Sequence, residues 1–213
     1  MIARLWMHVS LLVALAVSVV VVAAAPAARA ADVYDLDQSH FSIVFSVSHM
    51  KMSYTYGMFR QAQARVTLDR ENPAGTKFQL SIKADSIDTN NAGRDTHLKG
   101  VDFFDTASFP DITFESTTVV LDSRPQQGIV YQVTGNLTMH GVTRSVTLPI
   151  QLLGEGPGPD GKPHAGFLTQ TELKRSDFGI TKFLENNMVG DAIGITVSFE
   201  GIQQSGGAAP PPR

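Results

Sequence analysis

Alternating apolar and polar positions dominate the chain after its first 30 residues. In FSIVFSVSH (41–49) the apolar residues occupy the odd positions and the serines the even ones, with Val44 as the exception. A period of two over nine positions is typical of a β-strand with one buried face. The same alternation predicts strands over 77–85, 129–139, 142–153 and 194–202.

Three further extended segments, 57–69, 112–122 and 164–175, bring the number of expected strands to about eight. Antiparallel strands of this number are stabilised by closing into a barrel, because closure removes the exposed edges. A barrel of eight strands has an interior just wide enough for side chains or for one small ligand. The sequence therefore predicts an all-β protein built as an antiparallel eight-stranded barrel.

One segment, TNNAGRDTHLKGVDFF (89–104), lacks the alternation. Asn90 or Asn91 is a suitable N-cap and Gly100 a suitable C-cap, which predicts a short helical insertion near residues 90–100. Its polar residues Arg94, Asp95 and His97 have three interpretations. They could form a catalytic or metal-binding cluster, they could satisfy backbone groups in a lid, or Arg94 and His97 could contact the polar end of an apolar ligand.

The N-terminus has the order of a secretory signal peptide. Arg4 precedes an uncharged apolar run over residues 9–25, and Ala28 and Ala30 form an A-x-A cleavage motif. We expect cleavage near Ala30 and a periplasmic or secreted protein, with an uncleaved membrane anchor as the alternative. The folded domain is then expected over residues 31–203, and the Gly-, Ala- and Pro-rich residues 204–213 form a disordered tail.

Composition excludes several classes of function. The chain has no cysteine, so thiol chemistry, Cys-ligated zinc and a lipid-modified N-terminus are excluded. Its net charge of −3 becomes more negative once residues 1–30, which contain two arginines and no acid, are removed. A mildly acidic chain is not expected to bind nucleic acid. No H-E-x-x-H or G-x-S-x-G motif is present, so the sequence predicts no metal site and no catalytic residue.

Four blocks of sequence resemble the YceI-like, or polyisoprenoid-binding, family. They are YDLDQSHFSIVFSVSHM (34–50), SIDTNNAGRDTHLKGVDFFDTASFPDITFES (86–116), YQVTGNLTMHGVTRSVTLPI (131–150) and LKRSDFGI (173–180). The blocks occur in the order of the family and cover nearly the whole chain after the leader. The resemblance implies a lipocalin-like barrel with an apolar tunnel that holds an isoprenoid-chain lipid, such as a quinone or a polyprenyl compound.

The inward face of each expected strand and the phenylalanines after the helix supply the candidate tunnel lining. The candidates are Phe41, Ile43, Phe45, Val47, Phe78, Leu80, Ile82, Phe103, Phe104, Phe114, Tyr131, Val133, Ile195 and Val197. Ordinary core packing is the alternative role for each of them.

Polar residues at the ends of these segments are candidates for the mouth of the tunnel. They are His49, Arg94, His97, Arg175 and Asp177. Arg175 and Asp177 share a face of a regular strand, so they could form a salt bridge, a turn bond or a polar plug. A structural role is the alternative for His49.

The expected function is carriage, storage or sequestration of an isoprenoid lipid by an exported protein that is not an enzyme. No cofactor is expected other than the bound lipid. Two alternatives remain open, a hydrolase acting on lipids and a stress or interaction protein whose barrel is packed solid. The resemblance also admits a homodimer and transient contact with a membrane, and no interface can be read from the sequence.

Overall fold

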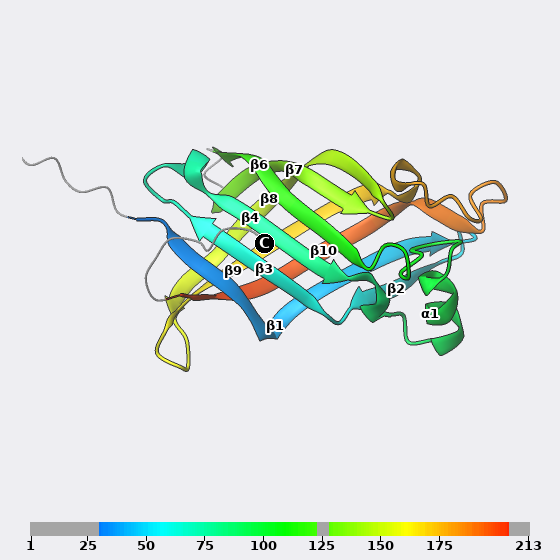
Figure 1. Ribbon diagram of the computed structural model, residues 1–213, viewed down its shortest axis with the longest axis horizontal. Helices are drawn as coiled ribbons and strands as arrows, with labels where there is room; N and C mark the ends of the chain where they lie inside the picture. The colour runs from blue at the N-terminus through cyan, green and yellow to red at the C-terminus, as the bar shows by residue number, and fades with distance from the viewer. Residues whose placement is uncertain (1–29, 123–127, 205–213) are drawn as a thin grey trace, which may run out of the picture.

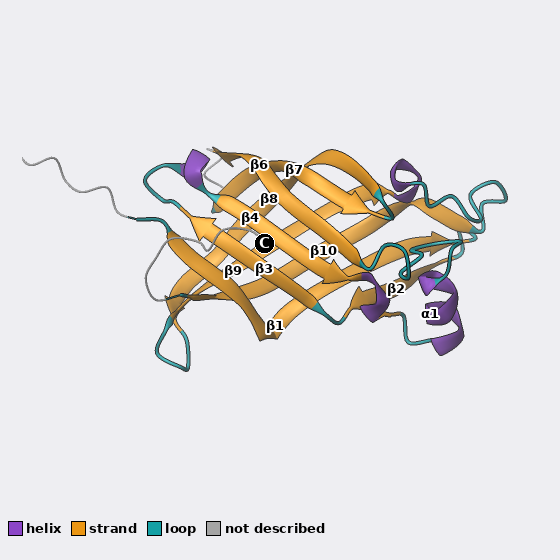
Figure 2. Ribbon diagram, viewed as in Figure 1, coloured by secondary structure: helices purple, strands orange, loops and turns teal. Residues whose placement is uncertain are grey.

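The computed structural model describes residues 30–122 and 128–204, and most of these residues lie in β-strands (Figures 1 and 2). The strands are β1 (Asp32–His49), β2 (Ser53–Phe59), β3 (Ala62–Leu68), β4 (Lys77–Lys83), β5 (Ile87–Asp88), β6 (Asp111–Asp122), β7 (Ile129–Met139), β8 (Val142–Pro157), β9 (Pro163–Lys174) and β10 (Val189–Gln203). One α-helix, α1 (Ala92–Lys99), and short 3₁₀ turns at Pro73–Gly75, Ala84–Ser86 and Arg175–Phe178 complete the described part.

All but the last residue of the predicted signal peptide and all but the first residue of the predicted tail lie outside the described residues. Within the described ranges, no helix has the length and apolar character needed to cross a membrane.

Eight strands close into an antiparallel barrel, as predicted. The order around the barrel is β1-β3-β4-β6-β7-β8-β9-β10, and β10 pairs again with β1. This closing ladder is long, since it runs from Tyr34↔Gln203 at one end to His49↔Val189 at the other. Because β10 pairs with β1, the eight-stranded ring has no open edge. Its strands cross the barrel obliquely in Figure 1.

The segment 57–69, expected as one strand, is divided into β2 and β3. The edge of β1 that faces away from β10 has two partners. It pairs with β3 over residues 32–35 and with β2 over residues 43–49. The chain crosses between the two partners at Arg60 and Gln61, whose backbone N–H groups both donate to Ser86 Oγ at 3.2 and 3.1 Å. The break follows from a contact with a distant residue, which alternation does not reveal.

The expected helix forms as α1, at the end of the barrel opposite to the start of β1 (Figure 1). The Asn91 side chain accepts a hydrogen bond from the Arg94 backbone N–H, and the Gly100 N–H donates to the His97 carbonyl. Asn91 is thus the N-cap and Gly100 the C-cap. The helix exposes most of its surface, so its position depends on the contacts described below.

One half of the barrel, at the end where β1 begins, is packed solid. Its core consists of Tyr34, Val66, Leu68, Phe78, Phe114, Val119, Tyr131, Val133, Ile150, Leu152, Ala165 and Phe167, all at most 8% exposed. The Phe167 ring meets the rings of Tyr34 and Phe78 edge-on, at centroid distances of 6.4 and 5.9 Å. Interlocked aromatic rings leave no room for a ligand in this half.

Candidate functional site

The other half of the barrel contains an internal cavity of about 200 Å³. Its wall is almost entirely apolar and extends from the aromatic core to α1 and the loop before β10. Most of the residues expected to line a tunnel lie on this wall: Ile43, Phe45, Val47, Phe78, Leu80, Ile82, Phe103, Phe104, Phe114, Ile195 and Val197. Their contact with a ligand stays a prediction.

Three residues expected in the tunnel lining lie outside the cavity wall. Tyr131 and Val133 belong to the solid core, where they are 3% and 0% exposed. Phe41 packs against a second buried cluster, which includes Ile43 and Val197, but is not part of the cavity wall. Alternation placed their side chains inside the barrel, but it carries no information on how far along the barrel axis the hollow part extends.

The cavity has an aromatic floor. Phe78, Phe114, Phe167 and Phe199 all belong to its wall, and the Phe167 and Phe199 rings lie 5.2 Å apart. Beyond this floor the solid core fills the barrel. The interior is therefore a blind pocket that extends toward α1 and not a tunnel through the whole barrel.

A charged network closes the solid end. The Arg70 guanidinium forms ion pairs with Asp32 and Glu155 and donates to the Tyr34 hydroxyl at 3.0 Å. Burial alone would lower the pKa of Arg70, but the hydrogen bonds to Glu155 and Tyr34 outweigh burial and raise it. Burial raises the pKa of Tyr34. The Tyr34 hydroxyl is thus paired, which allows Tyr34 to remain almost fully buried.

Among the described wall residues, Arg175 is the one that carries a charge, and it is only 5% exposed. Its guanidinium donates to four backbone carbonyls, those of Ile180, Lys182, Val189 and Gly190, at 2.8–3.0 Å. Burial lowers the pKa of Arg175, and the nearby Asp191 acts in the opposite direction. The side chain thereby fixes the loop that joins β9 to β10.

The four bonds use four of the five N–H groups of Arg175. The bonds found among the described residues do not use the second N–H of Nη1. Arg175 therefore holds the loop from the cavity wall and has one N–H that these four bonds leave unused.

The remaining candidates for a polar mouth do not line the cavity. Arg94 donates to the Thr89 hydroxyl and carbonyl, both at 2.7 Å, and Asp95 accepts from the Thr89 backbone N–H. These bonds anchor α1 to the end of β5, as the lid interpretation expected. His97 lies 3.2 Å from Asp102 and packs edge-on against Phe103.

His49 and Asp177 are both exposed, and Asp177 forms no pair with Arg175. Arg175 instead binds backbone carbonyls, because it lies in a 3₁₀ turn where residues two apart do not share a face as they would on a strand.

Thr169 on β9 is a wall residue that the sequence interpretation missed. Phe167, Thr169, Thr171 and Leu173 alternate along β9 and all lie on the wall. The Thr169 Oγ1 atom is buried and has no hydrogen-bond partner within residues 30–122 and 128–204. An unpartnered buried hydroxyl costs about 1–3 kcal/mol. The alternation within 164–175 would have found this residue, had polar residues on the inward face been considered.

Comparison with known proteins identifies the family. A family model described as the YceI-like domain matches residues 34–201. The chain belongs to the YceI-like family.

Similar proteins agree with this assignment in sequence and in fold. Protein YceI of Salmonella newport (strain SL254) is 37% identical over 170 residues, which cover 80% of this chain and 85% of the relative. The crystal structure of BcnA from Burkholderia cenocepacia superimposes with a TM-score of 0.68 at 24% identity, over 78% of this chain and 98% of BcnA. A polyisoprenoid binding domain from Saccharophagus degradans gives a TM-score of 0.62 at 18% identity, over 83% and 100% of the two chains. The YceI-like barrel predicted from the sequence is thereby confirmed.

The solid and hollow halves of this YceI-like barrel should respond differently to the same truncation. Val133 is fully buried in the solid core, whereas Val47 already faces free space in the cavity. We expect Val133→Ala to lower the free energy of unfolding by about 2 kcal/mol, because it removes two methyl groups and leaves a void. Val47→Ala should cost less than half of that. Urea denaturation of both variants measures the difference, and equal losses would contradict the division into two halves.

Removing the Arg175 guanidinium should destabilise the fold. Arg175→Met keeps the apolar stem but leaves one buried and three partly buried carbonyls without this donor, so we expect a loss of about 3–5 kcal/mol. Arg175→Lys should recover only part of the lost stability, because an ammonium group has three donors and cannot make all four bonds. The free energy of unfolding from urea titration is the measurement. A loss below about 1 kcal/mol for Arg175→Met would show that the four bonds do not hold the loop.

Proposed function

We propose that the protein binds one long isoprenoid-type lipid, such as an isoprenoid quinone or a polyprenyl compound, with its hydrocarbon chain inside the barrel. The observation that carries this proposal is the apolar cavity above a closed aromatic floor. Membership of the YceI-like family supports it, as does the likeness of the fold to a polyisoprenoid binding domain. The apolar wall favours a hydrocarbon chain of this type.

Burial of the chain supplies most of the binding free energy. Each CH₂ group removed from water contributes about 0.8 kcal/mol, so a few isoprene units bind with little polar help. The cavity of about 200 Å³ is smaller than the usual ligand pocket of about 300–1,000 Å³. A long chain must therefore move wall residues apart, and half-buried side chains such as Phe45, Val47 and Ile195 have the free space to do so.

Two polar groups on the wall give the ligand a preferred orientation. The Thr169 hydroxyl lies deep on β9. Arg175, with the N–H that its four bonds leave unused, lies closer to the loop before β10. An oxygen of the ligand that accepts from either group would remove the cost of leaving it unpartnered. A lipid with at least one oxygen is therefore favoured over a pure hydrocarbon.

The biological role that fits this chemistry is carriage, storage or sequestration of the lipid by an exported, periplasmic protein. The leader motif at residues 1–30 supports export. Large apolar side chains are exposed around the α1 end of the barrel, namely those of Met50, Met52, Val101 and Met188. A rim of this kind suits transient contact with a membrane, where the lipid enters or leaves without crossing water.

The two alternatives draw less support from the described residues. A lipid hydrolase needs a nucleophile and a base within hydrogen-bond reach, and the described wall residues include no Ser, Cys, His, Asp or Glu. A solid barrel describes only the half that contains the aromatic core. Binding of a lipid in the hollow half explains both observations.

Native mass spectrometry of the purified protein tests the proposal. We expect a bound mass that disappears on solvent extraction and returns on addition of a quinone or polyprenol with an isoprenoid tail. Ile195→Trp should block uptake by filling the cavity. Val120→Trp, at a position that is 56% exposed on β6, is the matched control and should bind normally. Failure of the folded wild-type protein to take up any of these lipids would contradict the proposal.

Replacing the Thr169 hydroxyl separates two effects. One is the loss of stability that the unpartnered hydroxyl causes in the lipid-free protein, and the other is its contribution to lipid affinity. Thr169→Val has the same shape without the unpartnered oxygen, so the lipid-free protein should gain about 1 kcal/mol of stability. Affinity for a polyprenol should fall about threefold to tenfold, and affinity for a plain hydrocarbon should not. Thermal unfolding and fluorescence titration measure the two effects. Equal affinity changes for both ligands would show that the hydroxyl does not contact the polar end.

A further inference from the structure

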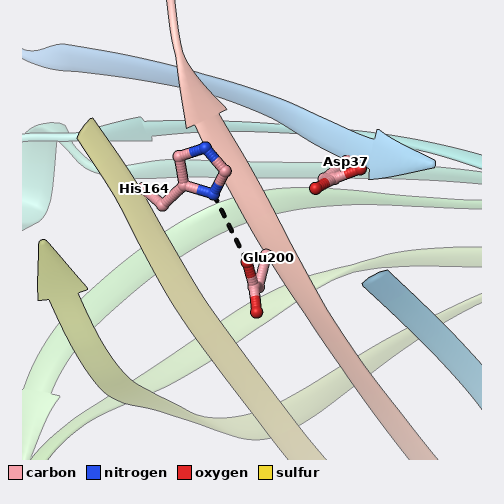
Figure 3. Close-up of side chains that lie close together, drawn as sticks. All are labelled: Asp37, His164 and Glu200. Atoms are coloured by element: carbon pink, nitrogen blue, oxygen red, sulfur yellow. Dashed lines mark hydrogen bonds and ion pairs between the residues drawn. The ribbon is translucent and has the colours of Figure 1, made fainter. Parts of the chain in front are cut away.

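A cluster of imidazole and carboxylate groups lies on the outer wall, away from the cavity. Asp37 on β1, His164 on β9 and Glu200 on β10 approach one another there (Figure 3). Their nearest nitrogen and oxygen atoms all lie within 4.8 Å of one another. The Asp37 and His164 side chains are each 13% exposed, and Glu200 is 47% exposed.

The bulge in β1 creates this juxtaposition. Pairing with β10 passes from Leu36↔Gly201 directly to Phe41↔Phe199, so four residues of β1, 37–40, lie opposite the single residue Glu200. The extra residues turn Asp37 toward the outer side chains of β9 and β10. Bulges commonly re-aim a side chain in this way.

Both nitrogens of the His164 ring face carboxylates. Nδ1 lies 3.3 Å from Glu200 Oε2, and Nε2 lies 3.2 Å from Asp160 Oδ1. A neutral imidazole has one N–H and one lone pair, so it can donate to only one of these carboxylates. The other nitrogen then directs its lone pair at an anion, which is unfavourable. A proton or a metal ion between that nitrogen and its carboxylate removes the repulsion, so the geometry is suited to either cation.

The position of the imidazole ring is fixed by the loop that precedes β9. A Cβ atom at Gly158 would lie 2.3 Å from His164 Nε2, so only a glycine allows the loop backbone to approach the ring this closely. With Nε2–H donated to Asp160, Nδ1 is the nitrogen that faces Glu200 and Asp37. Histidines that bind metals usually donate their second N–H to a carboxylate in this way.

We propose that Asp37, His164 Nδ1 and Glu200 bind a divalent metal ion of the zinc class on the outer wall, with Asp160 as the positioning residue for His164. A mixed set of one imidazole and two carboxylates suits Zn²⁺, whereas Ca²⁺ and Mg²⁺ prefer oxygen ligands alone. Zinc bonds of about 2.0–2.2 Å place neighbouring ligand atoms about 3.2–3.6 Å apart, and the His164–Glu200 separation already has this value.

Asp37 is prepared for this role. The His40 ring and the Ser39 backbone N–H each lie 2.8 Å from an oxygen of Asp37, and these hydrogen bonds orient its carboxylate. Its ligand oxygen lies within 4.8 Å of the other two, so it has to approach them by at most about 1.5 Å to complete a zinc site. A carboxylate on a bulge can move this far without disturbing the barrel.

Isothermal titration calorimetry of the protein, purified without an affinity tag and freed of metal with a chelator, tests the proposal. We expect one equivalent of Zn²⁺ to bind. His164→Ala and Glu200→Gln should each weaken binding by at least tenfold, and Asp160→Asn by about 10–100-fold. Gly158→Ala keeps every ligand but displaces the ring, so it should weaken binding as well. Unchanged thermal unfolding of the metal-free variants excludes loss of the fold.

A second histidine–carboxylate pair on the same protein provides the matched control. His97 lies 3.2 Å from Asp102, but the Lys182 ammonium is 3.0 Å from the same carboxylate and disfavours a cation there. His97→Ala should leave zinc affinity unchanged. Three results would overturn the proposal: no stoichiometric zinc on the wild type, equal losses in His97→Ala and His164→Ala, or tighter binding of Ca²⁺ or Mg²⁺ than of Zn²⁺.

The proposal is independent of the lipid. The cluster lies on the outer wall, and none of its residues lines the cavity. Zinc affinity should therefore be the same, within a factor of two, before and after solvent extraction of the lipid. A tenfold dependence on the lipid would show that the ion binds elsewhere, at a place that senses the cavity.

Discussion

The antiparallel pairing of β1 with β10 is the constraint on which the rest of the structure depends. It joins the first strand to the last, so it closes the barrel and separates inside from outside for every residue on the strands. Because side chains alternate, the register of this ladder decides which residues of β1 and β10 face the interior. A slip by one position would place serines in the cavity and apolar side chains in water.

Closure creates one interior, but the chain fills it unevenly. Aromatic rings occupy the half where β1 begins, and a paired charged network covers that end. Toward α1 the wall carries mainly aliphatic side chains and the phenylalanines that follow the helix, and these leave a cavity. The solid half supplies stability, which allows the other half to keep apolar surface available for a ligand. Arg175 and the Thr89 anchor of α1 hold the loops around the hollow end with hydrogen bonds, so those loops need little core of their own.

Alternation in the sequence predicted most of the strands because strand periodicity is a local property. It missed residues 32–40 of β1, where the bulge at 37–40 interrupts the pattern, and it joined β2 to β3 because their separation depends on the distant Ser86. The caps of α1 were readable, since Asn91 and Gly100 act on their immediate neighbours. Alternation does not indicate how far along the barrel axis a side chain lies, and for this reason Tyr131 and Val133 were predicted to line the tunnel. The outer cluster could not be foreseen either, because Asp37, His164 and Glu200 meet only after the barrel closes.

The central claim is that a lipid chain occupies the hollow half of the barrel and not the solid half. Nuclear Overhauser contacts between a bound polyprenol and methyl-labelled valine and isoleucine side chains test it most directly. The account predicts contacts to the methyl groups of Val47 and Ile195 and none to those of Val133. Contacts to Val133, or a bound lipid that contacts neither Val47 nor Ile195, would contradict it.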